Sequence, residues 1–181
     1  MRRFVWVLVL AAIAVGAFAY VNKTTPPWYE RIRYPLQYAS YVRIHAQEHG
    51  LDPAFVAAVI YQESKFRSNA KSSSGAIGLM QITPDTARGI AIRTHGSAFH
   101  TSDLYDPEIN IRYGAWYLDN LFKKYGSEQL VLAAYNAGQG NVDRWRTQGE
   151  PIQFAETRAY VKRVERLRTI YRHAWAKDLG Y

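Results

Sequence analysis

Three points in this chain share one helix-start signal, in which a residue that caps helix N-termini stands directly before a proline: Asp52-Pro53, Thr83-Pro84 and Asp106-Pro107. Proline suits the first helical turn because its φ is fixed and its missing N–H would have no partner there. The residue before it can accept a hydrogen bond from a free backbone N–H of that turn. Gly50 and Gly126 follow apolar-periodic segments and predict helix ends. A chain punctuated in this way is expected to be mainly helical.

Apolar residues that recur every three or four positions fill the stretches between these signals. We expect helices over these segments: 36–49, 53–64, a short one from 84, 107–125, 127–136, a short piece over 141–146, and 156–177. Residues 67–83 break the pattern with three consecutive serines and two glycines, and short strands are expected around 77–82. Residues 89–101 are expected to be loop. The fold class is therefore mainly α, with one small Gly/Ser-rich loop or β region.

The N-terminus has the pattern of an export segment. Two arginines precede residues 4–21, a run without any charged residue. A positive start followed by an apolar run is typical of a signal peptide, and a small-x-small pattern allows cleavage after Ala19. A run of about 18 apolar residues also reaches the lower limit for crossing a bilayer. Residues 1–21 are thus expected to be either a signal peptide or a membrane anchor.

The rest of the chain is expected to be a linker followed by one domain. Residues 22–34 contain two adjacent threonines and two adjacent prolines, which predict a linker, and residues 35–181 are expected to fold as a unit. The formal net charge of +8 fits an anionic partner or a plain basic surface, and charge alone does not choose between them. There is no cysteine, so disulfides, thiolate zinc sites and a cysteine nucleophile are excluded.

Glu63 is the acidic residue whose position best suits acid–base chemistry. It stands at the C-terminal end of an apolar helix, close to Phe66 and just before the Gly/Ser-rich break. Apolar surroundings and the partial negative charge of a helix C-terminus both disfavour a carboxylate, so both raise its pKa. A raised pKa is useful for general acid catalysis near neutral pH. Position alone is also compatible with an ordinary solvated glutamate.

Several blocks of residues favour the catalytic interpretation of Glu63 because they occur together in a fixed order. The blocks are Glu63-Ser64, Ser72, the stretch Gly-Ala-Ile-Gly-Leu-Met-Gln-Ile at 75–82, Ala-Ala-Tyr-Asn-Ala-Gly at 133–138, and Glu156-Thr157-Arg158 with Tyr160-Val161. In order and spacing they resemble the signature blocks of the soluble lytic transglycosylase family, over roughly residues 42–172. Two departures are Thr83, where many members have Met, and Arg67-Ser68, which replaces a common Asn-Pro.

The resemblance implies a goose-lysozyme-like fold, an α+β lysozyme type in which helices dominate. It also implies cleavage of the β-1,4 bond between N-acetylmuramic acid and N-acetylglucosamine, leaving 1,6-anhydromuramoyl ends. By the same resemblance Glu63 is the single catalytic acid and base, and the substrate's own N-acetyl group replaces the second carboxylate that most glycosidases use. The next acid, Asp85, is better explained as a helix-terminal residue.

Five further residues take roles by the same resemblance. Tyr135 is expected to orient Glu63 or to stabilise the acetamido intermediate, and the alternative is a core aromatic with a bonded hydroxyl. Ser72 and Gln81 are expected to bind sugar, although Ser72 could only cap a turn and Gln81 could only satisfy backbone groups. Asn136 and Glu156 are candidate substrate ligands that could equally be structural.

Aromatic residues offer surfaces on which sugar rings could stack. Trp116, Tyr113 and Trp145 are the candidates, and core packing is expected for at least two of them.

Three other functions compete with this interpretation. A hydrolytic lysozyme would need a carboxylate that positions water, and no acid in the break region fits. A non-catalytic cell-wall binding or assembly protein is disfavoured because Glu63, Gln81 and Tyr135 are all present. Nucleic-acid binding is disfavoured by the export segment and by the absence of a recognised motif. We therefore expect a monomeric enzyme without metal or cofactor, acting on peptidoglycan glycan strands.

The expected location follows from the export segment. The protein is expected in the periplasm or cell envelope, and it would be anchored to the inner membrane through residues 4–21 if the segment is retained.

Overall fold

Helices build almost the whole of the structure, a computed structural model that describes residues 2–94, 96 and 98–181. In chain order the elements are α1 (Arg2–Thr24), α2 (Pro27–Arg33), α3 (Ala39–Glu48), α4 (Pro53–Ser64), α5 (Pro84–Arg93), the 3-10 helix η1 (Thr101–Tyr105), α6 (Pro107–Tyr125), α7 (Glu128–Ala137), α8 (Gln139–Thr147), α9 (Ala155–Ala174) and α10 (Ala176–Leu179). No strand occurs among these described residues, and the expected β region is reduced to the isolated bridges Lys71–Ile77 and Ile77–Ile82. The prediction of a mainly helical domain is confirmed.

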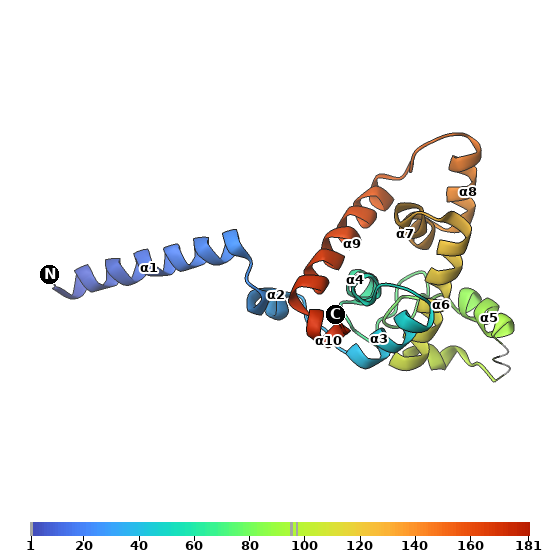
Figure 1. Cartoon of the computed structure of the whole chain (residues 1–181), viewed down its shortest axis with the longest axis horizontal. Coiled ribbons are helices and arrows are strands. Elements are labelled where there is room, and N and C mark those ends of the chain that lie inside the picture. Colours follow the sequence, from blue (N-terminus) through green and yellow to red (C-terminus); the bar gives the residue numbers. More distant parts are fainter. Residues whose placement is uncertain (1, 95, 97) are drawn as a thin grey trace.

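Helix α4 is the central element of the core. Every residue from position 54 to 60 is buried, as expected for a helix that is apolar on all sides. Helices α9 and α3 both pack against α4 (Figure 1). Helix α6 lies against α3, α5 and α7. The C-terminal end of α4 therefore meets α9 and the Gly/Ser-rich segment inside the molecule.

The three capping signals act as the sequence predicts. Asp52 accepts a hydrogen bond from Ala54 N at 2.9 Å, and Thr83 Oγ1 accepts one from Thr86 N at 3.3 Å. Asp106 Oδ1 accepts from the two backbone N–H groups that follow its proline. At the other end of α6, Gly126 closes the helix with φ of 66°, a conformation that favours glycine. Local capping chemistry thus determines where these helices begin and end.

The prediction of a loop over residues 89–101 is wrong at both ends of that segment, which are helical. Helix α5 continues to Arg93, and residues 101–105 form η1. A glycine inside a helix costs about 1 kcal/mol relative to alanine. Burial of Ile90 and Ala91 directly after Gly89 offsets that cost, because these side chains join the core. Of the same segment, His95 and Ser97 lie outside the described residues.

The second part of the predicted linker is a helix instead, because tertiary contacts hold it against the domain. Arg31 Nε donates to the Ala174 carbonyl at 2.8 Å, and its guanidinium lies 4.4 Å from the centre of the Trp175 ring. The buried Glu30 carboxylate is 2.8 Å from His173 Nδ1. Helix α2 is therefore packed against the end of α9, with α10 beside it.

Helix α1 extends away from this domain (Figure 1). Its described apolar side chains are largely exposed, among them Phe4 at 71% and Leu10 at 63%. Among the residues that the structure describes, no helix is both long enough and apolar enough to cross a membrane. The predicted cleavage point after Ala19 lies outside the residues whose side chains the structure describes.

Candidate active site

Glu63 occupies the last turn of α4, where its carboxyl is half-buried against α9. The Tyr160 hydroxyl donates a hydrogen bond to Glu63 Oε1 at 2.6 Å. Burial raises the pKa of Glu63 to about 7, and the hydrogen bond from Tyr160 lowers it and so offsets part of that rise. A carboxyl with this pKa is protonated in a large share of molecules near neutral pH, so it can both donate and accept a proton.

The chain turns sharply directly after α4. Lys65 and Phe66 both have left-handed backbone angles, with φ of 53° and 62°, and Gln81 has φ of 49°. Each such non-glycine residue costs of the order of 1 kcal/mol, and clusters of them are typical of functional sites. Burial of Phe66 and the hydrogen bond from Ser64 Oγ to the Leu79 carbonyl, at 2.7 Å, hold this turn in place. The Gly/Ser-rich segment is thereby tied to the end of the helix that carries the acid.

A buried amide fixes the other side of that segment. Asn110 on α6 donates to the Ile77 carbonyl at 3.0 Å and to the Leu104 carbonyl at 2.8 Å, and it accepts from Met80 N at 2.8 Å. Gly78 lies directly against it, with φ of 80°, and a β-carbon added there would be 2.1 Å from Asn110 Nδ2. Only glycine fits this position. The contact holds the backbone of residues 78–81 beside the acid.

Two buried tyrosine hydroxyls lie near Glu63, and they have different partners. Tyr135 donates to the Met80 carbonyl at 2.7 Å, and its ring packs 5.6 Å from the ring of Tyr117. Burial, and next the charge of Glu63, raise the pKa of Tyr135 and of Tyr160 well above the usual value. Both hydroxyls therefore stay protonated and act as donors. The hydroxyl that bonds Glu63 belongs to Tyr160, whereas Tyr135 bonds the loop backbone.

Tyr160 was not predicted as a site residue from the sequence. Its apolar spacing in the last helix explains it fully as a core residue, and it is 3% exposed. The available signal was its place in the block that begins at Glu156, four positions earlier. That block marks the segment but does not say which side chain reaches the acid.

Ser72 and Gln81 bond the loop itself. Ser72 Oγ accepts from Ala76 N at 3.0 Å and shares a hydrogen bond with Ser74 Oγ at 2.9 Å. Gln81 Nε2 donates to the Gly78 carbonyl at 2.9 Å and to the Ala70 carbonyl at 3.3 Å. Neither side chain forms a hydrogen bond with Glu63 within the described part of the chain. Both contribute to the conformation of the segment that borders the acid.

Asn136 and Glu156 lie at the junction of α7 and α9. Asn136 Oδ1 accepts from Thr157 Oγ1 at 2.8 Å, which links the end of one helix to the start of the other. Glu156 is exposed in the first turn of α9, and no hydrogen bond joins its side chain to another described residue. Asp85 is also exposed, 89% for its side chain, and it pairs with Arg88 rather than approaching Glu63.

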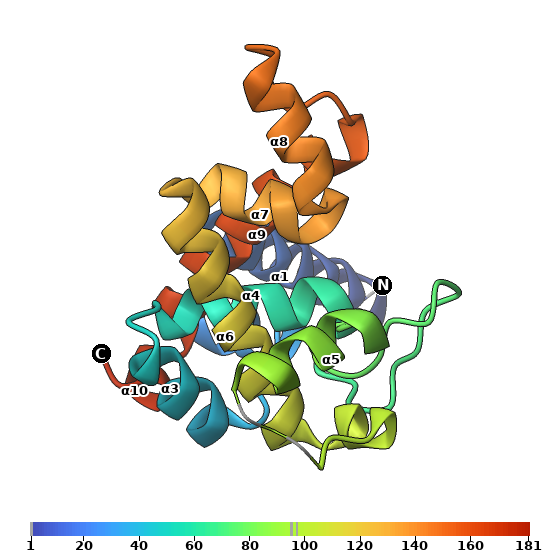
Figure 2. The ribbon, with the colours of Figure 1, turned by 90° about the vertical axis from the view of Figure 1, so that its right-hand side faces the viewer.

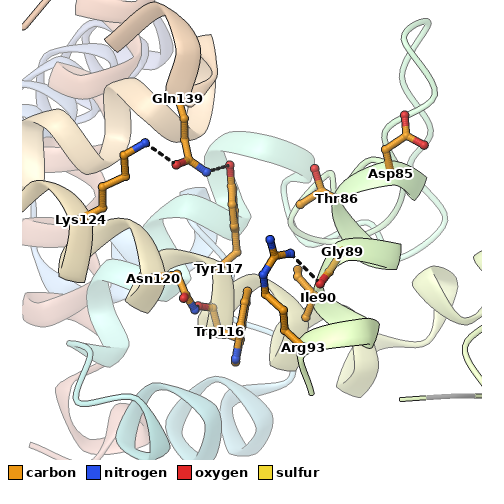
Figure 3. A pocket seen from close by; sticks show the side chains of 10 residues that line it. All are labelled: Asp85, Thr86, Gly89, Ile90, Arg93, Trp116, Tyr117, Asn120, Lys124 and Gln139. Carbon is orange, nitrogen blue, oxygen red and sulfur yellow. Dashed lines mark hydrogen bonds between the residues drawn. The ribbon is translucent and has the colours of Figure 1, made fainter. Parts of the chain in front are cut away.

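An open groove with a volume of about 600 Å³ lies next to this site. It runs between α5 and α6, which stand side by side on the face shown in Figure 2. Its lining residues, drawn in Figure 3, are Asp85, Thr86, Gly89, Ile90, Arg93, Trp116, Tyr117, Asn120, Lys124 and Gln139. Tyr117 joins the groove to the site because its ring packs against Tyr135. A volume of about 600 Å³ lies within the usual range of ligand-binding pockets.

The three candidate sugar-stacking aromatics lie in two different environments. Tyr113 and Trp145 are 6% and 4% exposed and belong to the core, whereas Trp116 lines the groove. Among the described residues, no cluster of histidine and acidic side chains could hold a metal ion.

A buried central helix that ends in a half-buried acid, beside an open groove, defines a lysozyme-like helical domain. The chain belongs to the Transglycosylase SLT domain family, whose sequence profile matches residues 40–155. The resemblance inferred from the sequence blocks is therefore confirmed.

Two similar proteins are named lytic murein transglycosylases. The soluble lytic murein transglycosylase of Escherichia coli is 34% identical over 154 residues, which cover 78% of this chain and 24% of that protein. The membrane-bound lytic murein transglycosylase C of Haemophilus influenzae is 36% identical over 118 residues, covering 60% of this chain and 33% of that protein. The chain thus spans about a quarter to a third of the length of these relatives.

Solved structures share the fold. The crystal structure of the 70-kDa soluble lytic transglycosylase of Escherichia coli gives a TM-score of 0.76 at 31% identity, covering 83% of this chain and 26% of that chain. The complex of the 70-kDa soluble lytic transglycosylase with bulgecin A gives 0.74 at 32% identity, covering 80% of this chain and 25% of that chain. The predicted lysozyme-like fold is confirmed.

Proposed function

We propose that this domain is a peptidoglycan lytic transglycosylase. It cleaves the β-1,4 bond between N-acetylmuramic acid and N-acetylglucosamine and leaves a 1,6-anhydromuramoyl end, with Glu63 as acid and base. The observation that carries the proposal is the half-buried Glu63 carboxyl with a pKa of about 7. Membership of the Transglycosylase SLT domain family supports the choice of substrate.

In the first step the protonated Glu63 donates its proton to the glycosidic oxygen. The bond from that oxygen to the muramoyl anomeric carbon breaks, and the carbonyl oxygen of the substrate's own N-acetyl group forms a bond to that carbon. No other carboxylate among the described residues contributes to the pKa of Glu63, in accord with a site in which the substrate supplies the second group.

In the second step the Glu63 carboxylate takes the proton of the muramoyl 6-hydroxyl. That oxygen bonds to the anomeric carbon as the acetamido oxygen leaves, so Glu63 is protonated again and no water is consumed. An intramolecular hydroxyl competes well against water because oriented groups reach effective molarities of about 10⁵ M or more. The hydrogen bond from Tyr160 fixes the carboxyl for both steps.

We propose substrate contacts for the polar residues around the acid. The amide oxygen of Gln81 accepts no hydrogen bond from other described residues, which leaves it open to a sugar hydroxyl or N–H. Asn136 and Glu156 are exposed and accessible to a glycan. Ser72 would bind sugar through its hydroxyl, and Tyr135 would position the loop through Met80.

The chain would act in the cell envelope, as a monomer on peptidoglycan strands. Relatives named soluble and membrane-bound murein transglycosylases support this location. Residues 1–21 would direct export, and comparing the mass of the mature protein with that of the full chain tests whether cleavage occurs after Ala19.

Mass spectrometry of a digest of insoluble peptidoglycan tests the proposed reaction, since anhydro and reducing ends differ by one water. We expect predominantly anhydro ends from the wild type. Tyr135→Phe should lower the rate and leave the product unchanged, because it removes a positioning contact without adding a base. Reducing ends would indicate a hydrolytic lysozyme instead, and no release would indicate a binding protein.

A further inference from the structure

Among the described residues that line the groove between α5 and α6, one cation has no carboxylate partner. Lys124 Nζ lies 2.7 Å from Asp143 Oδ2, so its charge is compensated. Asp85 pairs with Arg88. Arg93 donates to the Gly89 carbonyl at 2.9 Å, and it forms no ion pair within the part of the chain that the structure describes. Most of the donors of its guanidinium are therefore available to a ligand.

The Arg93 side chain lies close to the backbone of Gly89. A β-carbon added at Gly89 would be 3.1 Å from the Arg93 guanidinium nitrogen, which is closer than ordinary contacts. The Arg93 guanidinium lies beside Gly89 and lines the groove (Figure 3).

The opposite wall offers groups that suit a sugar. Trp116 and Tyr117 present half-buried aromatic surfaces, and such surfaces pair well with the apolar faces of sugar rings. Asn120 donates its amide N–H to the Trp116 carbonyl, and its amide oxygen makes no hydrogen bond with the described residues. The groove therefore combines aromatic surface, an open amide and one uncompensated cation, and it adjoins the site through Tyr117 and Tyr135.

We propose that this groove binds the part of the substrate next to the cleaved bond, and that Arg93 binds a carboxylate of its stem peptide. The inference rests on the proposed function. In an intact strand the lactyl groups are in amide linkage, so the carboxylates belong to the peptides. A guanidinium matches a carboxylate because its planar donors can form two parallel hydrogen bonds. Arg93 therefore makes the enzyme prefer strands whose peptides carry free carboxylates.

The test compares two forms of one substrate: soluble peptide-bearing strands, and the same strands after carbodiimide coupling of their carboxylates to methylamine. The measured quantity is the ratio of kcat/KM on the first form to that on the second. We expect Arg93→Gln to lower this ratio about fivefold, mainly through KM on the first form, as for loss of one charge-assisted hydrogen bond near the surface. Arg93→Lys should recover part of the ratio.

Arg166→Gln is the matched control, because it removes one positive charge from the exposed face of α9, away from the groove. Its ratio should equal that of the wild type. An unchanged ratio in Arg93→Gln, or the same decrease in Arg166→Gln, would overturn the inference.

Binding separates this inference from the proposed reaction. In a Glu63→Gln background, the affinities for the two forms of the strand are measured without turnover. We expect the free-carboxylate form to bind more tightly, and Arg93→Gln to remove that difference. Equal affinities in the presence of Arg93 would contradict the inference whatever the reaction proves to be. A wild type that cleaves neither form would contradict only the proposed reaction.

Discussion

The two ends of helix α4 each place a carboxyl against α9, with opposite electrostatic results. At the N-terminus, burial acts to raise the pKa of Asp52, but hydrogen bonds from Tyr181 and Arg168, with the charge of Arg168, outweigh it, and the pKa is lowered. At the C-terminus, burial raises the pKa of Glu63 to about 7, and among the described residues the hydrogen bond from Tyr160 is the opposing influence. The helix dipole reinforces both shifts, because it favours a carboxylate at the N-terminus and disfavours one at the C-terminus.

The two carboxyls at the interface of α4 and α9 differ in what their α9 partners do. Arg168 and Arg172 lie 2.5 and 2.7 Å from Asp52 Oδ2, so this end of α9 stabilises a charge. Two turns earlier α9 supplies Tyr160, a neutral donor that orients Glu63 without compensating a negative charge. The residue that α9 presents determines whether a carboxyl at this interface stabilises the fold or stays ready to exchange a proton.

The largest expected effect is on activity at the Glu63 end. Glu63→Gln keeps the size of the side chain and cannot donate a proton, and acid–base catalysis is worth about 10²–10⁴-fold per role. Because Glu63 is proposed to have both roles, we expect a loss of about 10⁴-fold or more in anhydromuropeptide release. Near-normal release by a folded variant, checked by circular dichroism, would remove Glu63 from the mechanism.

The next effect is on stability at the Asp52 end. Asp52→Ala removes the N-cap and leaves Arg172 without this partner, and we expect a loss of about 3 kcal/mol in the free energy of unfolding. Asp52→Asn keeps the cap acceptor and should lose about 1 kcal/mol less. Urea denaturation measures both. Because the pKa of Asp52 is lowered by folding, its contribution is present at neutral pH and disappears as the pH falls through the folded-state value. Equal stability of the three proteins would contradict the comparison.

Glu63 should have the opposite effect on stability. Its folded-state pKa of about 7 lies above the ordinary 4.5, so the folded state holds more protons between these values. The free energy of unfolding therefore falls as the pH rises through this window. Glu63→Gln does not titrate, and it should be more stable than the wild type by about 2 kcal/mol at pH 8, with no such gain at pH 4. Denaturation curves at both pH values measure this difference. A variant less stable than the wild type at pH 8 would show that ionised Glu63 does not destabilise the folded state.

The smallest expected effect is that of the Tyr160 hydroxyl. Tyr160→Phe removes the hydrogen bond that lowers the pKa of Glu63, so that pKa should rise further. The acid form would then persist to higher pH, and the alkaline decline of kcat/KM should move upward while the rate falls about tenfold. Tyr135→Phe serves as the control, because it removes a hydrogen bond to the Met80 carbonyl instead. It should leave the pH of the alkaline decline of kcat/KM unchanged. The reverse pattern would give Tyr135 the orienting role.

Helix boundaries were predictable because their causes are local. Asp52, Thr83 and Asp106 cap their own first turns, so a few adjacent residues contain the needed information. Gly89 is the counter-example, because the core contacts of Ile90 and Ala91 keep it helical, and these depend on the tertiary structure.

The site was predictable only in part, for a related reason. Glu63 follows from its helix end and from the sequence blocks around it. Its partner Tyr160 is 97 positions away, and the contact of Arg31 with the Ala174 carbonyl spans 143 positions. Such contacts arise from the packing of α4 and α2 on α9, and no local pattern in the sequence contains them.

The difference between the two ends of α4 can be measured directly by a ¹³C NMR titration of the carboxyl carbons, assigned with Glu63→Gln and Asp52→Asn. We predict that Glu63 titrates with a pKa of about 7 and that Asp52 titrates below its ordinary 3.8. A Glu63 midpoint near its ordinary 4.5 would contradict the account, because the acid would then be ionised at neutral pH and could not protonate the glycosidic oxygen.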